Sequence, residues 1–140
     1  MVAGFIPPDH WGEVSGALRK SGSVTLDANG NGVIEFHPDN ASQRWVVTSI
    51  VTQTNQASTA TLVPYVTGAL NTYSPSVLSP SNQFGTSYSA NNDTFGGALD
   101  VAPTDTFCVL YYPPPGQSGA ALAGVRAIAV IRGTFYTRRS

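Results

Sequence analysis

Two long stretches of the sequence alternate in side-chain character with a period of two residues. The first covers Trp45 to Thr54, and the second covers residues 120–137 and contains Gly124 and Gly133. A period of two puts successive side chains on opposite faces of an extended chain, whereas a helix has a period of 3.6. We predict two long β-strands here, the first with its odd-numbered residues on one face and both faces covered. The glycines predict β-bulges or close backbone approaches.

Several shorter segments are rich in β-branched and aromatic residues, and turn residues separate them. The 140 residues include 10 prolines and 14 glycines, and no long helical pattern lies between the segments. Proline within a strand favours an edge position, which we expect of residues 59–66 because of Pro64. The chain therefore predicts an all-β fold, an antiparallel β-sandwich or jelly roll of about seven or eight strands. The shorter predicted strands are 23–26, 33–36, 59–66, 74–78, 98–101 and 106–112.

Residues 1–22 predict an extended N-terminal arm, and residues 23–140 predict the β-sandwich domain. Pro7 and Pro8 stiffen the chain and disfavour a helix before them. Asp9 is a suitable N-cap for a short helix over residues 10–20, although an irregular arm fits equally well. We expect no secretory signal and no membrane-spanning segment, because no window is apolar enough.

Charge is scarce and unevenly distributed. Only 11% of the residues are charged, the net charge is -1, and residues 45–92 form a stretch of 48 residues without Asp, Glu, Lys, Arg or His. A typical soluble domain is about 25% charged. Nucleic-acid binding needs clustered Lys and Arg, so we expect no nucleic-acid partner. Because interface cores are depleted of charge, we expect a neighbouring subunit to cover the uncharged stretch.

The most distinctive short motif begins at Asp27. Oxygen-bearing side chains at Asp27, Asn29 and Asn31, followed by Gly32, match the first half of a calcium-binding loop. The match then ends, because Pro38 occupies the position that a bidentate Glu needs. A hairpin turn rich in Gly and Asn explains the same residues, so we prefer the turn and retain calcium as the alternative.

No pattern of catalytic residues rises above the background. Glu35, His37 and Asp39 alternate along one face and could hold a metal, but such a row is more often a solvated strand face. The single Cys108 lies in a predicted strand, where a lone cysteine is usually a small buried apolar residue. We therefore expect no enzyme activity, no catalytic residue and no cofactor.

Eight aromatic residues lie in or beside the uncharged half of the chain, and most of them are expected to fill the core. Tyr73, Tyr88 and Phe95 fall in predicted loops, so we assign them as candidate contact residues for a sugar or a protein.

Part of the chain resembles small virion proteins of tailed phages that infect actinobacteria. The similarity lies in the stretch from Gly32 to Asn55, in Thr86-Ser-Tyr-Ser-Ala-Asn-Asn-Asp-Thr94, and in a terminal strand with Ala127, Val130 and Gly133. The resemblance implies a β-sandwich or jelly-roll structural component of the capsid surface or the tail. It also implies an N-terminal arm that attaches to the virion and a β domain that forms trimers. It supplies no catalytic residues.

We therefore predict a capsid decoration protein located in the virion and assembled in the host cytoplasm. Its β domain would form a homo-oligomer, a trimer in the first place. Its arm would attach to the major capsid protein or another virion protein through Phe5, Ile6 and Trp11. One alternative is a minor tail or fibre module that binds host-surface glycans through the three loop aromatics. A calcium-dependent or hydrolytic enzyme is a further alternative.

Overall fold

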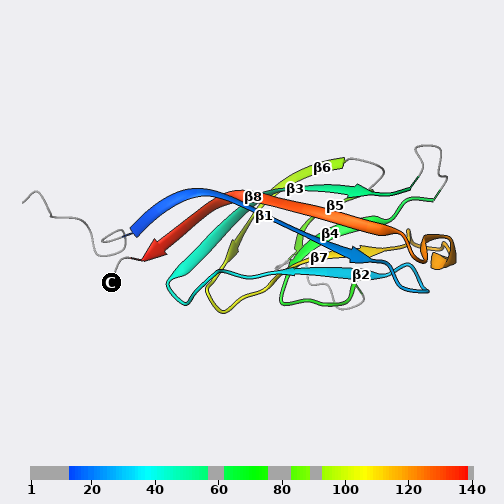
Figure 1. Cartoon of the computed structure of the whole chain (residues 1–140), viewed down its shortest axis with the longest axis horizontal. Coiled ribbons are helices and arrows are strands. Elements are labelled where there is room, and N and C mark those ends of the chain that lie inside the picture. Colours follow the sequence, from blue (N-terminus) through cyan, green and yellow to red (C-terminus); the bar gives the residue numbers. More distant parts are fainter. Residues whose placement is uncertain (1–12, 57–61, 76–82, 89–92, 139–140) are drawn as a thin grey trace, which may run out of the picture.

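Eight β-strands and one short 3-10 helix make up the described part of the chain, in a computed structural model (Figure 1). The structure describes residues 13–56, 62–75, 83–88 and 93–138. The strands are β1 (Glu13–Thr25), β2 (Gly32–Phe36), β3 (Gln43–Thr54), β4 (Tyr65–Leu70), β5 (Gln83–Tyr88), β6 (Asp93–Val101), β7 (Phe107–Tyr112) and β8 (Arg126–Arg138), with the helix η3 (Gly119–Leu122) before β8.

The strands form two antiparallel four-stranded sheets that pack face to face. Sheet A has the order β1-β8-β3-β6, and sheet B has the order β2-β7-β4-β5. Each strand is followed by a strand of the opposite sheet, except that β4 is followed by β5 in the same sheet. All the strand pairs are antiparallel. This order is that of an eight-stranded jelly roll, so the predicted fold class is confirmed. None of the described residues lies in a helix of the length and apolarity that a membrane crossing requires.

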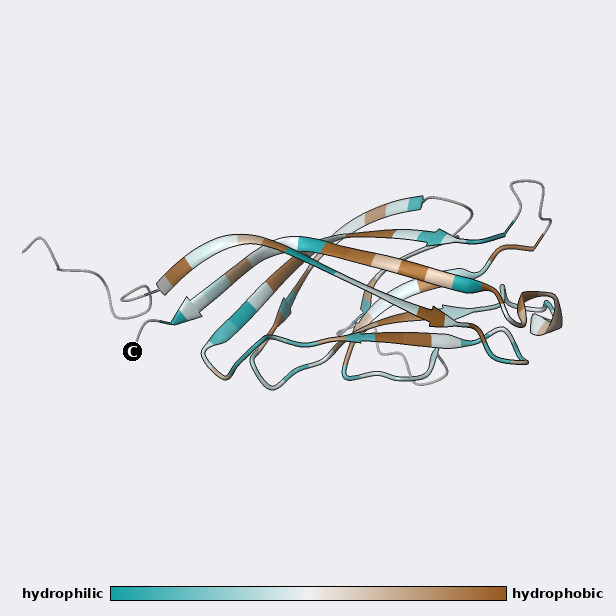
Figure 2. Ribbon diagram, viewed as in Figure 1, coloured by the Kyte–Doolittle hydropathy of each residue, from teal (hydrophilic) through white to brown (hydrophobic). Residues whose placement is uncertain are grey.

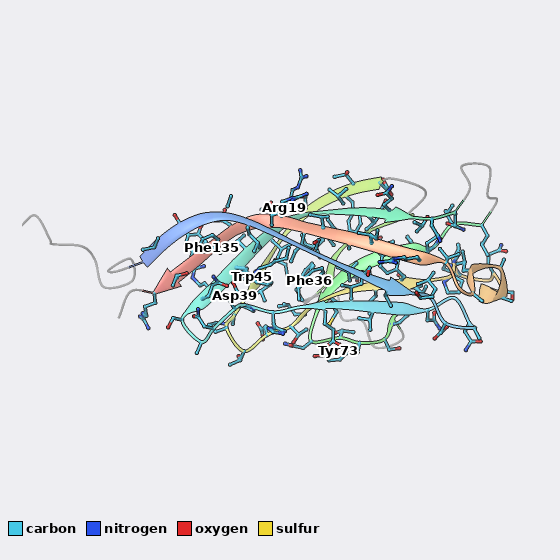
Figure 3. All side chains as sticks on the ribbon, in the orientation of Figure 1. Arg19, Phe36, Asp39, Trp45, Tyr73 and Phe135 are labelled. Atoms are coloured by element: carbon cyan, nitrogen blue, oxygen red, sulfur yellow. The ribbon has the colours of Figure 1, made fainter. Side chains whose placement is uncertain are left out.

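The core fills the space between the sheets. Trp45, Phe84, Phe107 and Ile50 are among its largest fully buried side chains. The rings of Phe84 and Phe107 meet edge to face at 5.8 Å, a favoured aromatic geometry. Figure 3 shows Trp45 pointing into the interior between the strands. The inward residues come from alternate positions of each strand, as the period of two requires.

The predictions for both long strands hold in part. Strand β8 begins at Arg126 rather than at residue 120, because residues 119–122 form η3 and Gly124 lies in a turn with a positive φ of 79°. Ala127, Ala129 and Ile131 of β8 are buried and alternate with outward residues. In β3, Trp45 and Val47 point inward as predicted, but a bulge between Val47 and Ser49 changes the register. Beyond the bulge the even-numbered residues from Ile50 are buried, and the outer face of β3 is not covered by the described chain.

The helix predicted over residues 10–20 does not form in its described part, because Glu13–Lys20 belong to β1. The boundary at residue 22 is therefore misplaced, and residues 13–22 belong to sheet A. Gly16 and Gly22, which weaken a helix, are strand positions beneath large side chains. A Cβ at Gly16 would lie 2.6 Å from the Phe135 ring, and one at Gly22 would lie 2.7 Å from Ile34.

Three further segments differ from the prediction. Residues 62–64 are not strand, and β4 begins after Pro64, since proline has no N–H to give to a ladder. Strand β4 lies between β7 and β5 rather than at an edge. Between the predicted strands 74–78 and 98–101 the structure has β5 and most of β6, which the sequence analysis does not predict.

Gly133 sits where β8 crosses the bulge of β3, which confirms the predicted close approach. A Cβ at this position would lie 1.9 Å from the carbonyl oxygen of Val46. We expect Gly133→Ala to lower the free energy of unfolding by about 3 kcal/mol in urea denaturation, since the backbone of β3 must move. The control is Gly96→Ala in the same sheet, where the nearest atom is 3.5 Å away. Equal stability of the two variants would contradict the close approach.

Candidate functional site

The N-terminal arm joins the β domain at the edge of sheet A. Strand β1 pairs along its whole length with β8, from Glu13 opposite Arg138 to Thr25 opposite Arg126. Its other side faces no strand of the sheet. The part of the predicted arm that precedes β1 is residues 1–12. The candidate attachment residues Phe5, Ile6 and Trp11 are in this segment and lie outside the described residues.

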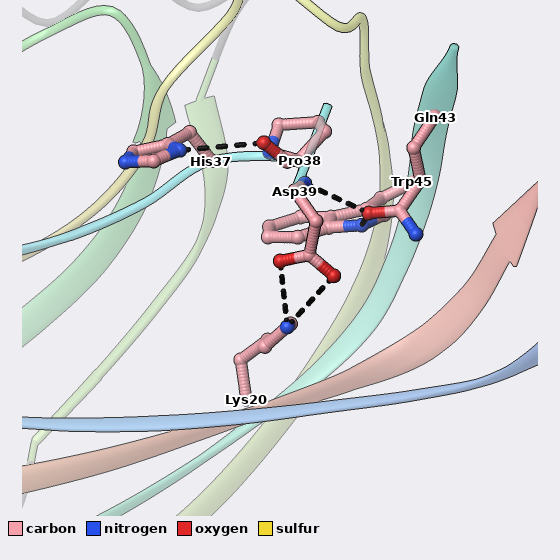
Figure 4. Close-up of polar contacts among 6 residues, drawn as sticks. All are labelled: Lys20, His37, Pro38, Asp39, Gln43 and Trp45. Carbon is pink, nitrogen blue, oxygen red and sulfur yellow. Dashed lines mark hydrogen bonds and ion pairs between the residues drawn. The ribbon is translucent and has the colours of Figure 1, made fainter. Parts of the chain in front are cut away.

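An ion pair and a glutamine hold β1 against the β2–β3 connection (Figure 4). The Lys20 Nζ lies 2.9 and 3.1 Å from the two carboxylate oxygens of Asp39. The Gln43 side-chain oxygen accepts hydrogen bonds from the backbone N–H of Asp39 at 2.9 Å and from the Trp45 indole N–H at 3.0 Å. These residues, together with β1 and Phe135, line a pocket of about 170 Å³. The buried indole N–H of Trp45 therefore has a hydrogen-bond partner, and the residues of this pocket connect β1 to the β2–β3 connection.

Two of the predicted metal candidates have other partners in the structure. Asp27 Oδ1 accepts the backbone N–H groups of Asn29 at 2.8 Å and Asn31 at 3.0 Å, which closes a tight turn. This turn connects β1 to β2 across the two sheets, so the predicted hairpin is wrong although the turn itself forms. Asp39 is paired with Lys20, and Glu35 is exposed. Among the described residues, no group of three or more His, Cys, Asp or Glu is placed to hold a metal.

Tyr73 is a predicted contact residue whose side chain is accessible. Its side chain is 52% exposed, in the connection that follows β4. Figure 3 shows it on the opposite side of the sandwich from Arg19. It lines a pocket of about 190 Å³ with Asp27 and Asn31 of the β1–β2 turn and with Ser74 and Pro75. An exposed ring beside carboxylate and amide groups can stack on a sugar and hydrogen bond to its hydroxyls.

Tyr88 and Phe95 differ from the prediction, because both lie in strands. Tyr88 is the last residue of β5 and pairs with Tyr65 of β4. Phe95 of β6 is partly buried against the core, with its ring 6.1 Å from that of Phe84. Phe95 is therefore a packing residue. The Tyr88 side chain lies outside the described part of the structure, so among the described side chains Tyr73 is the remaining contact candidate.

The uncharged stretch does not form a single face. Its described residues supply β3 to sheet A and β4 and β5 to sheet B. Strands β3 and β4 lie inside their sheets, and half of their side chains are buried in the core. Much of the missing charge in this stretch therefore reflects the interior of the sandwich. The idea that one neighbour covers the whole stretch does not fit this division.

The basic residues, in contrast, are concentrated in one sheet, which the sequence pattern alone did not reveal. No Lys or Arg occurs between Arg44 and Arg126, and the described ones lie in β1, β3 and β8 of sheet A. Sheet B contains none. The period-two alternation of residues 126–132 already places Arg126 and Arg132 on one face. Arg19 was missing from that face because its segment was predicted to be helical.

Buried thiol and phenol groups lie in β7. Cys108 is fully buried on the outer side of sheet B with Ala69 and Leu110, as expected of a small apolar residue. Burial raises the pKa of the Cys108 thiol from 9.0 to about 11, and Glu35 adds to this, while a hydrogen bond from the Thr72 backbone lowers it. Burial also raises the pKa of Tyr111, whose hydroxyl donates to the Ile128 carbonyl oxygen at 3.3 Å.

No protein-family model matches the chain, and no curated protein matches it. A solved structure titled "Structure of infectious bursal disease virus Gx strain" is similar over 91% of this chain, with 11% sequence identity and a TM-score of 0.33. The chain spans 37% of the length of that viral chain. These values are too low to establish a shared fold. The resemblance to actinobacterial phage proteins stays a prediction.

The raised pKa of Cys108 predicts a loss of stability at alkaline pH. Between pH 9 and about 11 the unfolded thiol loses its proton while the folded thiol keeps it. The free energy of unfolding should therefore fall by about 1.4 kcal/mol per pH unit in this window. Urea denaturation of Cys108→Ala should show a shallower decline, with the contribution of Tyr111 unchanged. Parallel declines in the two proteins would contradict the assignment.

Proposed function

We propose that the protein is a virion structural protein, specifically a capsid decoration protein. In this proposal the β domain forms a homo-oligomer, a trimer in the first place, and residues 1–12 attach to the major capsid protein or another virion protein. The protein would act by burying surface on a particle lattice, where many modest contacts add up.

The observation that carries the proposal is the strand order of the two sheets. The arrangement β1-β8-β3-β6 over β2-β7-β4-β5 is the jelly roll. Jelly rolls are characteristic of viral capsid domains, lectins and cupins. The chain has two histidines, and His37 is exposed at the end of β2, which does not suit the inward histidine cluster of a metal-dependent enzyme. A structural or binding role is therefore favoured over catalysis.

The position of β1 supports attachment through the arm. Because β1 is an edge strand fixed to β8 and to Asp39, the segment before it starts from a rigid point. Phe5, Ile6 and Trp11 supply three large apolar side chains within twelve residues of this point. Such side chains in a short polypeptide are typical anchors in a pocket of a partner protein.

The arm is tested on particles made by the genome that encodes the chain. We expect Phe5→Ala/Ile6→Ala/Trp11→Ala to reduce the particle-bound fraction at least about tenfold in co-sedimentation, since each anchor contributes more than about 1 kcal/mol. The thermal midpoint should not change, because β1 begins after these residues.

The matched control is Asp9→Asn/His10→Gln, which alters polar residues of the same arm. Wild-type attachment of the triple variant would contradict the arm. Absence of the wild-type chain from the particles would contradict the virion assignment itself. Deletions that extend past residue 12 are unsuitable, because they remove part of β1.

The Tyr73 pocket favours a second candidate function, a tail or fibre module that binds host-surface glycans. Tyr73, Asp27 and Asn31 combine a stacking ring with polar groups around one opening. Lectins are among the domains that use the jelly roll.

A glycan array distinguishes this function from capsid decoration. If the pocket binds a sugar, Tyr73→Ala should lower the affinity about tenfold, because stacking on an exposed ring is worth on the order of 1 kcal/mol. Tyr136→Ala, which changes an aromatic residue on the opposite sheet, is the control. Failure of the wild-type protein to bind any glycan would exclude this second function.

A further inference from the structure

The outer face of sheet A gathers five arginines, and we call it the arginine face. Residues that alternate with the buried positions of β1, β3 and β8 point outward here. Each of the five arginines is exposed. The chain has seven Lys and Arg in total, so this face holds most of its positive charge. The five residues are Arg19, Arg44, Arg126, Arg132 and Arg138.

Two of these arginines lie directly opposite each other. Arg19 of β1 pairs with Arg132 of β8, and both are exposed on the same face. Like charges at directly opposed strand positions destabilise a sheet. Arg44 lies over the ring of Tyr136, with its guanidinium carbon 4.1 Å from the ring centroid. The repulsion between Arg19 and Arg132 therefore lowers the stability of the sheet, which indicates that these two arginines serve binding rather than folding.

Within the described part of the chain, the acids of sheet A lie at its ends and at its β6 edge, away from the central pair Arg19 and Arg132. Asp100 pairs with Val46 at the β6 edge of sheet A. Asp39 is bound to Lys20, and Asp105 accepts from Asn71 and from the backbone of Ala102 in the β6–β7 connection. The remaining described acids are Glu13, which begins β1 and pairs with Arg138, and Asp27, Glu35 and Asp93, which lie in the β1–β2 turn, in sheet B and at the start of β6.

Aliphatic side chains separate the charged positions. Val51 of β3 pairs with Val130 of β8, which in turn pairs with Ser21 of β1. Ile128, next along β8 on the same face, is 38% exposed. Figure 2 shows β8 as largely hydrophobic along this stretch, with hydrophilic positions on either side. The face is therefore an apolar centre with arginines around it, which is the composition of a protein interface.

We propose that the arginine face docks onto an acidic surface of a different protein. Carboxylates of the partner would pair with Arg19, Arg132 and Arg126, and its apolar side chains would cover Val130 and Ile128. Arginine suits this role because its planar guanidinium binds carboxylates through two hydrogen bonds. The partner is recognised by clustered Asp and Glu around a small apolar patch.

Other occupants fit less well. A nucleic acid bound as a single strand needs exposed aromatic rings for its bases. Among the described residues of this face the aromatic ring is that of Tyr136, which Arg44 already covers. A second copy related by two-fold symmetry would place arginines against arginines. In the proposed decoration protein, the arginine face is the surface that faces the lattice. It rests on that function only in taking the partner to be a particle protein.

The test uses the full chain and fluorescein-labelled poly-L-glutamate, measured by fluorescence anisotropy at several salt concentrations. We expect binding that weakens as salt rises. Arg19→Gln/Arg132→Gln should weaken the binding about tenfold, because the loss of each charge pair weakens it about threefold. The control is Gln117→Glu/Ala121→Glu, which makes the same change in net charge at exposed positions before β8.

Several outcomes overturn the proposal. These are no binding by the wild type, equal weakening in the two double variants, and tighter binding of a labelled single-stranded oligonucleotide than of poly-L-glutamate. Self-association that Arg19→Gln/Arg132→Gln abolishes, seen by analytical ultracentrifugation, would assign the face to a second copy. Co-sedimentation of the same variants with particles tests the virion assignment separately from the docking of the arginine face onto an acidic surface. If poly-L-glutamate binding succeeds but the wild type is absent from particles, the virion assignment fails while the docking chemistry stands.

Discussion

The structure depends on the position of β8 between β1 and β3. The last strand of the chain pairs on one side with the first strand and on the other with β3, so sheet A joins segments that are far apart in sequence. Its inward residues Ala127, Ala129 and Ile131 belong to the core cluster, in which Ile34 of β2 and Tyr111 of β7 are also buried. The sheet cannot be completed until the C-terminal residues are available. Folds with such non-local pairing fold slowly compared with those built from local contacts.

Much of the strand content could be predicted from the sequence, because period-two alternation is a local property. The faces of β8 follow directly from that alternation. The bulge at Val47 and Ser49 could not be predicted, since it depends on how Gly133 of β8 crosses β3. The extended conformation of Glu13–Lys20 could not be predicted from the sequence either. Its cause is β8, more than a hundred residues away, together with the Phe135 and Ile34 side chains that use the space above Gly16 and Gly22.

Less of the candidate sites than of the fold could be predicted from the sequence. Exposure of Tyr73 followed from its place in a loop, but its proximity to the Asp27 turn depends on the crossing of β1 to β2 between the sheets. The scarcity of charge predicts an uncharged surface that a neighbour covers. The structure places that stretch largely in the interior and gives the more informative surface to five arginines. Their clustering depends on strand order, because Arg19, Arg44 and Arg132 meet only when β1, β8 and β3 are adjacent.

The pairing of Glu13 with Arg138 brings the start and the end of the β domain to the same end of the sandwich (Figure 1). A fluorescent protein or an antigen fused after residue 140 would therefore sit beside the arm and crowd it. The connection after β7 lies at the opposite end, where a methyl group added at Gly116 would meet no atom within 4 Å. Cargo inserted there would be held a full strand length from the arm. For display or labelling, this internal turn is a better fusion point than the C-terminus.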